Sequence, residues 1–434
     1  MRPVSQVPVT VVGIGADGWP GLAPTAREAL RGADVLIGGP RQLGLLPPEC
    51  AGERVAWPSP LRPAVPGLLA AHSGRRVCVL ASGDPMFFGI GRTLAETVGT
   101  DALHVLPHPS SVSHACARLG WPLERTEVVS AVGRPLAALA AALHDGVRLL
   151  VLSAGAATPA ETAALLRERG YGPSRLTVLE QLGAPGERAV TGTARDWPHP
   201  PGDALNVVAV ECRRAPDAPR LALTPGLPDE SFEHDGQLTK RHIRAATLAA
   251  LAPAPGELLW DVGGGSGSIG IEWMRAHPDC RAVTVERDPV RAARITRNAE
   301  TLGVPSLRVV TGAAPAALGQ LPTPDAVFIG GGLTAPGLLA ACWDALPPGG
   351  RLVANTVTLE SEALLADWYR RVGGELTRLA VSHAAAVGNF TGWRQAMPVT
   401  QWSVTKPAGE HPAHPARPAR PACPARPAEG EIRA

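Results

Sequence analysis

Lysine, and charge in general, is scarce in this sequence. Charged residues make up 18% of the 434 residues, the formal net charge is +2, and the only lysines are Lys240 and Lys406. No arginine-rich block with interleaved aromatic residues occurs. Because affinity for nucleic acid depends on clustered cationic side chains, this composition argues against a nucleic-acid partner. A hydrophobic content of 45% also argues against wholesale disorder.

The sequence also lacks the marks of metal binding, export and membrane insertion. Its seven cysteines are scattered, with no C-x-x-C pair and no histidine at zinc spacing, which predicts no metal site and favours a reducing, cytoplasmic location. Gly13, Gly15 and Asp17 interrupt the apolar N-terminal stretch before a signal-peptide core can form. The longest uncharged stretch, 326–343, contains three consecutive glycines and a proline, which favours a strand, a glycine turn and a helix over a membrane span.

The length of the chain predicts two or three domains. Residues 1–212 alternate short β-rich runs with segments of helical length, as in an α/β domain, and we expect two subdomains that meet near residue 108, the second with a mixed sheet. Residues 213–226 lack periodicity and predict a linker. A second strand–helix unit spans 227–405, and the Pro/Ala/Arg-rich tail at 406–434 is predicted to be disordered.

Hydrophobic periodicity places strands and helices along both units. Strands are predicted in the first unit at Val9–Val12, Val35–Ile37, Val77–Ala81, Leu103–Leu106, Glu127–Ser130, Leu149–Leu152, Leu176–Glu180 and Asn206–Glu211. Helices are predicted in the second unit at Thr239–Leu251, Ser268–Ala276, Pro289–Leu302, Leu338–Ala345 and Ser361–Val372. Its predicted strands are Leu258–Val262, Ala282–Glu286, Leu307–Val310, Asp325–Ile329, Arg351–Thr356, Glu375–Val381 and Val399–Val404.

A glycine-rich loop follows the first predicted strand of the second unit. It carries Asp261, Gly263, Gly265 and Gly267 and leads directly into a predicted helix. Glycines let the backbone turn sharply and approach a ligand, while a helix N-terminus presents unpaired N–H groups. The next strand ends at Glu286, whose carboxylate can accept two hydrogen bonds from ribose hydroxyls. Together these features predict a cofactor that carries adenosine.

The loop by itself leaves the identity of that cofactor open. Gly265, Gly267 and Gly270 also satisfy G-x-G-x-x-G, the dinucleotide fingerprint. The acidic residue that opens the loop and the extra glycine at 263 favour the D-x-G-x-G-x-G loop of methyltransferases that use S-adenosylmethionine. A purely structural strand-to-helix turn is the third interpretation.

Three loops of the first unit are candidates for another ligand site. Each follows a predicted strand, and open α/β sheets bind ligands at the carboxyl ends of their strands. The strand after the first of these loops ends in two glycines, which leaves no carboxylate for a ribose and argues against a NAD site. Plain structural turns are the alternative. The residues singled out are Gly13, Gly15, Gly83, Asp84, Met86, Ser110 and Ser111.

Both units resemble known methyltransferase families. The first resembles the tetrapyrrole methylases, whose pattern is a V-G-I-G turn, a G-D-P-x-x-[FY]-G loop and a P-x-x-S-S segment. The second, with Leu238-Thr239-Lys240 before the Asp261 loop and P-D-A-V-F-I-G-G from Pro324 after it, resembles the decarboxylating precorrin methyltransferases. The resemblance spans about residues 8–405, with several motifs in the same order.

This resemblance implies an α/β fold made of a class III tetrapyrrole methylase with two subdomains, followed by a class I Rossmann-like methyltransferase with a seven-stranded sheet. It implies that two methyl groups pass from S-adenosylmethionine to carbons 5 and 15 of a reduced tetrapyrrole, and that the acetate on ring carbon 12 leaves as carbon dioxide. The tetrapyrrole is then a small-molecule partner, and the family suggests a homo-oligomer. A nicotinamide-dependent tetrapyrrole reductase, or one half acting as a non-catalytic tetrapyrrole carrier, are the alternatives.

The resemblance also implies two sites for S-adenosylmethionine. One lies near the loops of the first unit, and the other lies on Asp261 to Gly267 with Glu286. Gly264 and Ala313 depart from the residues common in the family, so we expect the adenine contact to fall to the backbone of Gly312 to Ala314, with Ala313 and Ala314 as contact residues.

The segment before the glycine loop of the second unit is dense in titratable groups that suit a polycarboxylate substrate. In a helix from Thr239, Lys240 and Arg244 are one turn apart and can grip substrate carboxylates. The alternative is a solvated helix with Thr239 as its N-cap. Asp235 and His234 are candidates for proton handling. Farther on, His383 and residues 389–393 can close over a planar macrocycle, whereas packing of Trp393 at a sheet edge is the alternative.

Overall fold

The computed structural model describes residues 8–407, which form two compact units. Unit 1 comprises the described residues up to His234 together with Ala293–Leu307, and unit 2 comprises Asp235–Ala292 and the described residues from Arg308 onward. The predicted tail at 406–434 lies outside the described residues, apart from positions 406 and 407. Within the described part of the chain, no helix is long and apolar enough to cross a membrane, and no group of three potential metal ligands is found.

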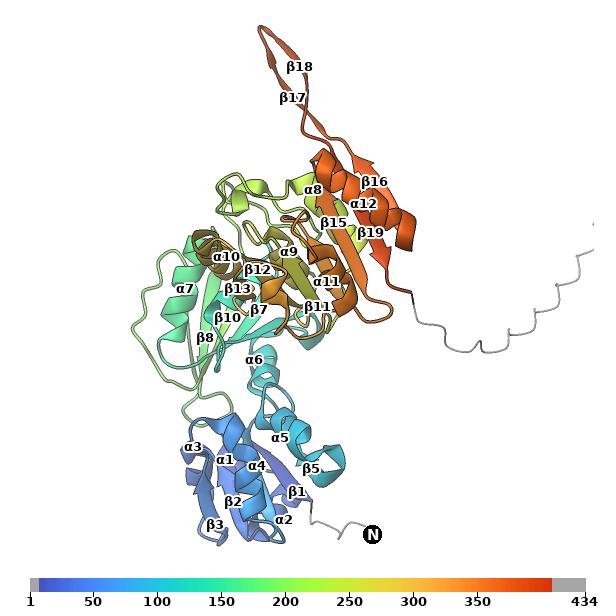
Figure 1. Cartoon of the computed structure of the whole chain (residues 1–434). Helices are drawn as coiled ribbons and strands as arrows, with labels where there is room; N and C mark the ends of the chain where they lie inside the picture. Colours follow the sequence, from blue (N-terminus) through green and yellow to red (C-terminus); the bar gives the residue numbers. More distant parts are fainter. Residues whose placement is uncertain (1–7, 408–434) are drawn as a thin grey trace, which may run out of the picture. The chain divides into compact units, whose positions relative to one another are not determined.

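The first part of unit 1 is a parallel sheet of five strands within the described range, drawn in blue in Figure 1. The strands lie in the order β3 (Glu53–Ala56), β2 (Val35–Gly38), β4 (Val77–Ser82), β1 (Val9–Ile14) and β5 (Leu103–Leu106). The helices are α1 (Gly18–Gly21), α2 (Pro24–Arg31), α3 (Pro40–Gly44), α4 (Leu61–Ala71) and α5 (Ile90–Val98). Apolar clusters cover both faces, so β2 and β4 are almost entirely buried. The sequence did not predict β3, because this edge strand is largely exposed.

The second part of unit 1 is a mixed sheet, as predicted. Its strands lie in the order β6 (Glu127–Ser130), β7 (Arg148–Leu152), β10 (Asn206–Glu211), β8 (Arg175–Glu180) and β9 (Arg188–Thr193). Only β6 and β7 pair in parallel among these described strands. Its helices are α6 (Ser111–Leu119) and α7 (Thr158–Glu168), and α6 packs against β10. The chain therefore passes between the two sheets at 107–110, close to the expected position. The exposed edge strand β9 was not predicted.

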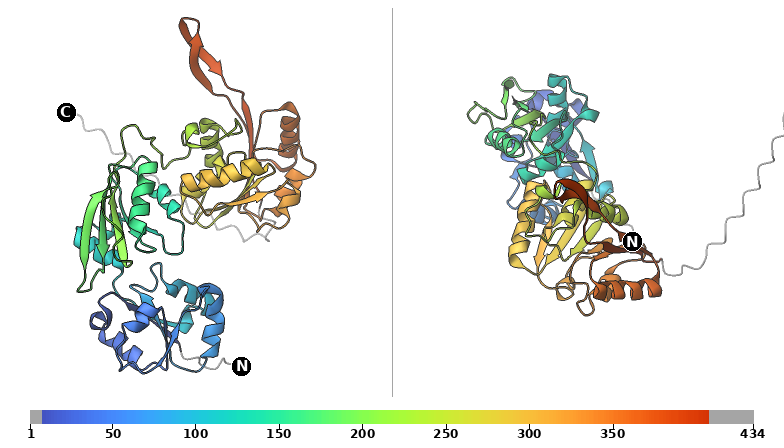
Figure 2. Two further views of the ribbon diagram at one scale, coloured as in Figure 1. Left: turned by 90° about the vertical axis from the view of Figure 1, so that its left-hand side faces the viewer. Right: turned by 90° about the horizontal axis from the view of Figure 1, so that it is seen from above.

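Unit 2 is built on the expected sheet of seven strands, counted over the described residues. The order is β13 (Arg308–Thr311), β12 (Arg281–Glu286), β11 (Leu258–Val262), β14 (Ala326–Ile329), β15 (Arg351–Thr356), β19 (Val399–Thr405) and β16 (Glu375–Leu379). The first five are parallel, and β19 runs antiparallel to both of its neighbours. The sheet is covered by helices (Figure 2), namely α8 (Arg241–Leu251), α9 (Ser268–Ala276), α11 (Leu338–Ala345) and α12 (Leu359–Val372). Helix α10 (Pro289–Thr301) begins in unit 2.

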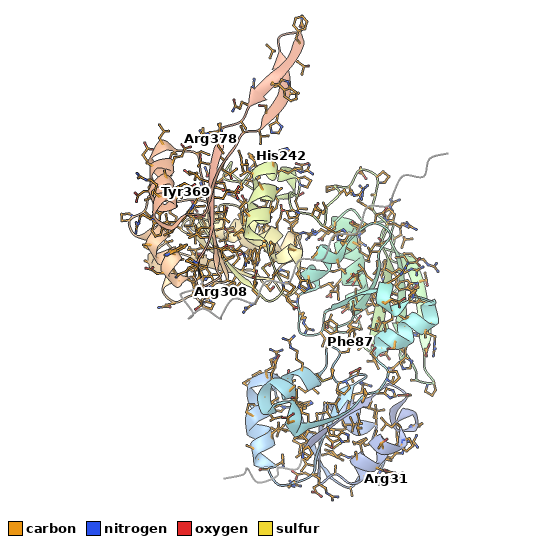
Figure 3. All side chains as sticks on the ribbon, turned by 90° about the vertical axis from the view of Figure 1, so that its right-hand side faces the viewer. Arg31, Phe87, His242, Arg308, Tyr369 and Arg378 are labelled. Carbon is orange, nitrogen blue, oxygen red and sulfur yellow. The ribbon has the colours of Figure 1, made fainter. Side chains whose placement is uncertain are left out.

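A two-stranded hairpin leaves the seven-stranded sheet between β16 and β19. It consists of β17 (Ser382–Val387) and β18 (Phe390–Gln395), which pair with each other (Figure 1). The His242 ring, labelled in Figure 3, lies 5.7 Å from the His383 ring at the start of β17, measured between centroids. Trp393 is 80% exposed, so the interpretation that it packs at a sheet edge is wrong. Closure over a macrocycle stays a prediction.

Candidate functional site

The glycine-rich loop of unit 2 is a tight turn at the carboxyl end of β11. The N–H groups of Gly263 and Gly264 both donate to the carbonyl of Val285, which ties the loop to the neighbouring strand β12. Gly263 has φ +77°, and a Cβ there would lie 2.8 Å from the backbone nitrogen of Gly331, in the loop after β14. Only glycine fits this position, because the conformation is left-handed and a second backbone lies against it.

Glu286 lies at the carboxyl end of β12, beside this loop. Its Oε2 accepts a hydrogen bond from the Gly265 N–H at 2.8 Å, and its Oε1 accepts one from the Asp288 N–H at 3.0 Å. The Gly312 N–H donates to the Glu286 carbonyl, so the chain that follows β13, with Ala313 and Ala314, begins at the same edge of the sheet. The structure therefore brings Glu286, the glycine loop and the predicted adenine contact together, while their cofactor contacts stay predictions.

Asp261 is buried beneath the loop, with 1% exposure. Its Oδ2 accepts hydrogen bonds from the Gly270 N–H at 3.1 Å and from the Thr284 hydroxyl at 3.3 Å, which fastens helix α9 to the sheet. Burial raises the pKa of this carboxyl to about 7; the two hydrogen bonds oppose the rise, and the charge of Glu286 adds to it. The carboxyl is thus costly to ionise in the folded protein.

We expect this raised pKa to make unit 2 less stable as the pH rises. The folded protein keeps the Asp261 proton between about pH 4 and pH 7, whereas the unfolded chain releases it, so the free energy of unfolding falls across that window. Asp261→Asn removes the titration. In urea denaturation, the free energy of unfolding of the wild type relative to the variant should fall by roughly 2–3 kcal/mol from about pH 5 to about pH 8. If the free energy of unfolding of the two proteins changed with pH in parallel, the raised pKa of Asp261 would be contradicted.

The titratable segment before α8 takes a different form from the predicted one. Helix α8 begins at Arg241 with Lys240 in the N-cap position and without a side-chain cap, so the interpretation of Thr239 as N-cap is wrong. Arg244 is fully buried and pairs with Glu272 at 2.5 Å, so it cannot share a solvent-facing grip with Lys240. The physical reason is tertiary, because α8 packs against α9 on the side that carries Arg244.

The three predicted residues of this segment remain on the surface. Lys240 is exposed at the start of α8, and His234 is exposed in the chain before it. Asp235 accepts a hydrogen bond at Oδ2 from the Arg291 guanidinium at 2.9 Å. No local sequence pattern indicates this pairing, because the partners are far apart along the chain. Catalytic roles for the three residues stay predictions.

The three predicted loops of unit 1 meet at the carboxyl ends of β1, β4 and β5. A Cβ on Gly13 would lie 2.1 Å from the Gly83 carbonyl oxygen and 2.8 Å from the His108 nitrogen, so the three backbones are in close contact. Ser110 is the N-cap of α6, where its hydroxyl accepts from the Ser113 N–H at 3.1 Å. The loops therefore converge as predicted.

The loop after β4 presents an apolar surface beside this point. Asp84 accepts a hydrogen bond from the Met86 N–H at 2.8 Å, which shapes the turn. Met86 is 51% exposed, and Phe87, labelled in Figure 3, is also exposed. Arg134 of the second subdomain places its guanidinium 5.1 Å from the centre of the Phe88 ring. Side chains of both subdomains thus flank the converging loops.

Sequence reasoning missed a buried contact between two of these loops. The Nε2 atom of His108 lies 3.2 Å from Oδ1 of Asp17, with the histidine side chain 7% exposed. Among the described residues, neither atom has a partner with hydrogen-bond geometry, so the contact is a close approach of the two groups. Both residues lie in the loops that the sequence singled out, but no local pattern indicates that they approach each other.

Comparisons with known proteins agree with this architecture. The family of tetrapyrrole (corrin/porphyrin) methylases matches residues 8–198, and the precorrin methyltransferase domain matches residues 230–406. The precorrin-6Y C(5,15)-methyltransferase (decarboxylating) of Sinorhizobium sp is 51% identical over 92% of this chain and 96% of its own length.

Shorter relatives match parts of the chain. The cobalt-precorrin-7 C(5)-methyltransferase of Salmonella typhimurium is 33% identical over 42% of this chain and 88% of its own length. The probable cobalt-precorrin-6B C(15)-methyltransferase (decarboxylating) of Pyrobaculum calidifontis is 35% identical over 41% of this chain and 93% of its own length.

These matches decide between the functions that the sequence left open. They confirm the α/β fold, the methyltransferase activity and the use of S-adenosylmethionine that such families imply, and they favour neither a nicotinamide-dependent reductase nor a carrier. The chain belongs to the family of decarboxylating precorrin-6Y C(5,15)-methyltransferases.

Proposed function

We propose that this chain methylates carbons 5 and 15 of precorrin-6B and releases the acetate on ring carbon 12 as carbon dioxide, which yields precorrin-8 in cobalamin biosynthesis. The observation that carries the proposal is that each unit has its own glycine-lined loops at the carboxyl ends of parallel strands. Two such sites allow two methyl transfers by one polypeptide.

We assign carbon 5 to unit 1, and carbon 15 with the decarboxylation to unit 2. The assignment is supported by the order of the two family matches along the chain. It is further supported by the separate relatives named for a C(5) reaction and for a decarboxylating C(15) reaction, each of which matches about two fifths of this chain.

The residues of unit 2 fit an adenosine-bearing methyl donor. S-adenosylmethionine supplies an electrophilic methyl group when it is bound. The Gly265 and Asp288 N–H groups hold the Glu286 carboxylate, and each oxygen keeps a lone pair for a ribose hydroxyl. We propose that Asp261, Gly263, Gly265 and Gly267 shape the loop that receives the donor. The backbone of Ala313 and Ala314 then contacts the adenine.

The residues of unit 1 fit a second donor in a different way. Gly13, Gly15 and Gly83 let three loops converge, and Asp84 and Met86 form the turn beside them. We propose that Ser110 and Ser111, at the start of α6, present backbone N–H groups to the carboxylate of the donor.

Catalysis of methyl transfer rests mainly on alignment, because the displacement is in line and needs no protein nucleophile. Positioning of this kind can supply on the order of 7–11 kcal/mol. We propose that Lys240 binds a carboxylate of the macrocycle, and that Asp235 and His234 handle protons. Protonation of the macrocycle itself provides an electron sink for loss of carbon dioxide. We also propose a cytoplasmic location, supported by the six free cysteines among the described residues, and a homo-oligomer, supported by the family.

The test is mass spectrometry of the product that the purified full-length protein forms from precorrin-6B and S-adenosylmethionine. We expect two added methyl groups and the loss of one carbon dioxide. Calorimetric titration should show that each chain binds two equivalents of S-adenosylmethionine. A product with a single added methyl group, or uptake of one equivalent, would contradict the two-site proposal.

A further inference from the structure

An ion pair between Arg244 and Glu272 is buried at the junction of α8 and α9 in unit 2. The side chains are 0% and 3% exposed, and Arg244 Nε lies 2.5 Å from Glu272 Oε1. The Arg244 guanidinium also donates to the carbonyl oxygen of Thr239. Burying both charges is costly, and such pairs are often no more stabilising than apolar side chains of similar size. Stability alone therefore does not account for this arrangement.

The carbonyl that Arg244 holds belongs to a short segment, residues 235–240, which we name the strap. The strap lies directly against the glycine-rich loop 261–267, which we call the cofactor loop. A Cβ on Gly265 would lie 3.0 Å from the Gln237 carbonyl oxygen. At its other end, Asp235 is held by Arg291. Two arginines thus fasten the two ends of the strap on either side of the point where it meets Gly265.

Both partners of the buried pair are linked to the cofactor loop. Glu272 lies in α9, which starts at Ser268 directly after the loop. Gly265 contacts the strap on one side and donates its N–H to Glu286 on the other. A shift of the strap would therefore reach the residue that orients the proposed ribose acceptor.

We propose that Arg244 is a positioning residue for the reaction of unit 2: by joining Glu272 to the Thr239 carbonyl, it fixes the strap against the cofactor loop. The proposal rests on the function proposed above for unit 2. Arg244 acts through its contacts with the strap and with α9, because its own guanidinium is buried away from solvent.

The experiment uses the full-length protein and measures carbon dioxide release as a function of S-adenosylmethionine concentration. The variants are Arg244→Lys and the double variant Arg244→Met with Glu272→Met, which removes both charges together. The control is Arg378→Met with Glu362→Met, a partly exposed pair in the same unit with an N–O distance of 3.0 Å; Arg378 is labelled in Figure 3. Melting temperature is measured for each protein without ligand.

We expect the Arg244/Glu272 double variant to melt near the wild-type temperature while its KM for S-adenosylmethionine rises about tenfold or more. Arg244→Lys should have a KM between those of the wild type and the double variant, because lysine can donate to Glu272 or to the Thr239 carbonyl. The control pair should match the wild type.

Two results would overturn the inference. One is a wild-type KM in the double variant. The other is a loss of activity in Arg244→Lys and in the double variant that simply follows a loss of folding, which would make the pair merely structural. If the wild type itself released no carbon dioxide, the proposed function of unit 2 would fail instead.

Discussion

Glu286→Ala should abolish binding of S-adenosylmethionine at the site of unit 2. The substitution removes the proposed acceptor of two ribose hydrogen bonds, and hydrogen bonds to a charged group contribute about 1.5–3 kcal/mol each. The expected loss of binding free energy is about 3–6 kcal/mol, which raises Kd about a hundredfold to ten-thousandfold. The substitution also removes the carboxylate that accepts hydrogen bonds from the Gly265 and Asp288 N–H groups and orders them. Calorimetry should then register one equivalent of S-adenosylmethionine per chain.

The matched control is Glu375→Ala, which removes an exposed glutamate from the edge strand β16 of the same unit. This variant should bind two equivalents. Carbon dioxide release should be lost in Glu286→Ala and retained in Glu375→Ala. If Glu286→Ala still binds two equivalents with unchanged affinity, the role assigned to this carboxylate is wrong.

Gly13→Ala should close the proposed cofactor site of unit 1. The added Cβ would lie 2.1 Å from the Gly83 carbonyl oxygen and 2.9 Å from the His108 Cβ, closer than atoms pack. The loops after β4 and β5 must then move apart from β1. Overpacking of this kind costs about 1–3 kcal/mol of stability. Displacing the loops should lower methylation at carbon 5 about a hundredfold or more.

Gly44→Ala is the control within the same subdomain. Gly44 ends helix α3, and an added Cβ there meets no atom within 4 Å. This variant should keep both methylations. Gly13→Ala should keep carbon dioxide release, because that reaction is assigned to unit 2. Normal methylation of carbon 5 by Gly13→Ala would show that the loops of unit 1 are not its cofactor site.

Much of the fold was predictable from periodicity, and the failures have physical causes. Strands β5, β6, β10, β11 and β15 begin and end where the sequence predicts, because they are apolar runs bounded by turn residues. The edge strands β3 and β9 and the hairpin β17–β18 were missed, because their exposed residues carry no apolar periodicity. Pairing with a neighbouring strand, rather than burial, makes them strands.

The loops that we propose as ligand sites could be identified from the sequence. Each of these loops has a local signal, because a strand, a glycine turn and a helix start follow one another in consecutive residues. The signal was enough to identify Asp261 with its glycines, Glu286, and the loops around Gly13, Gly83 and Ser110. The contacts that hold these loops in place are visible only in the tertiary structure. Arg244 is buried against Glu272 instead of reaching the substrate, and His108 meets Asp17. Such contacts join residues that are far apart in the chain, and only the packing of helices and loops on the sheets brings them within bonding distance.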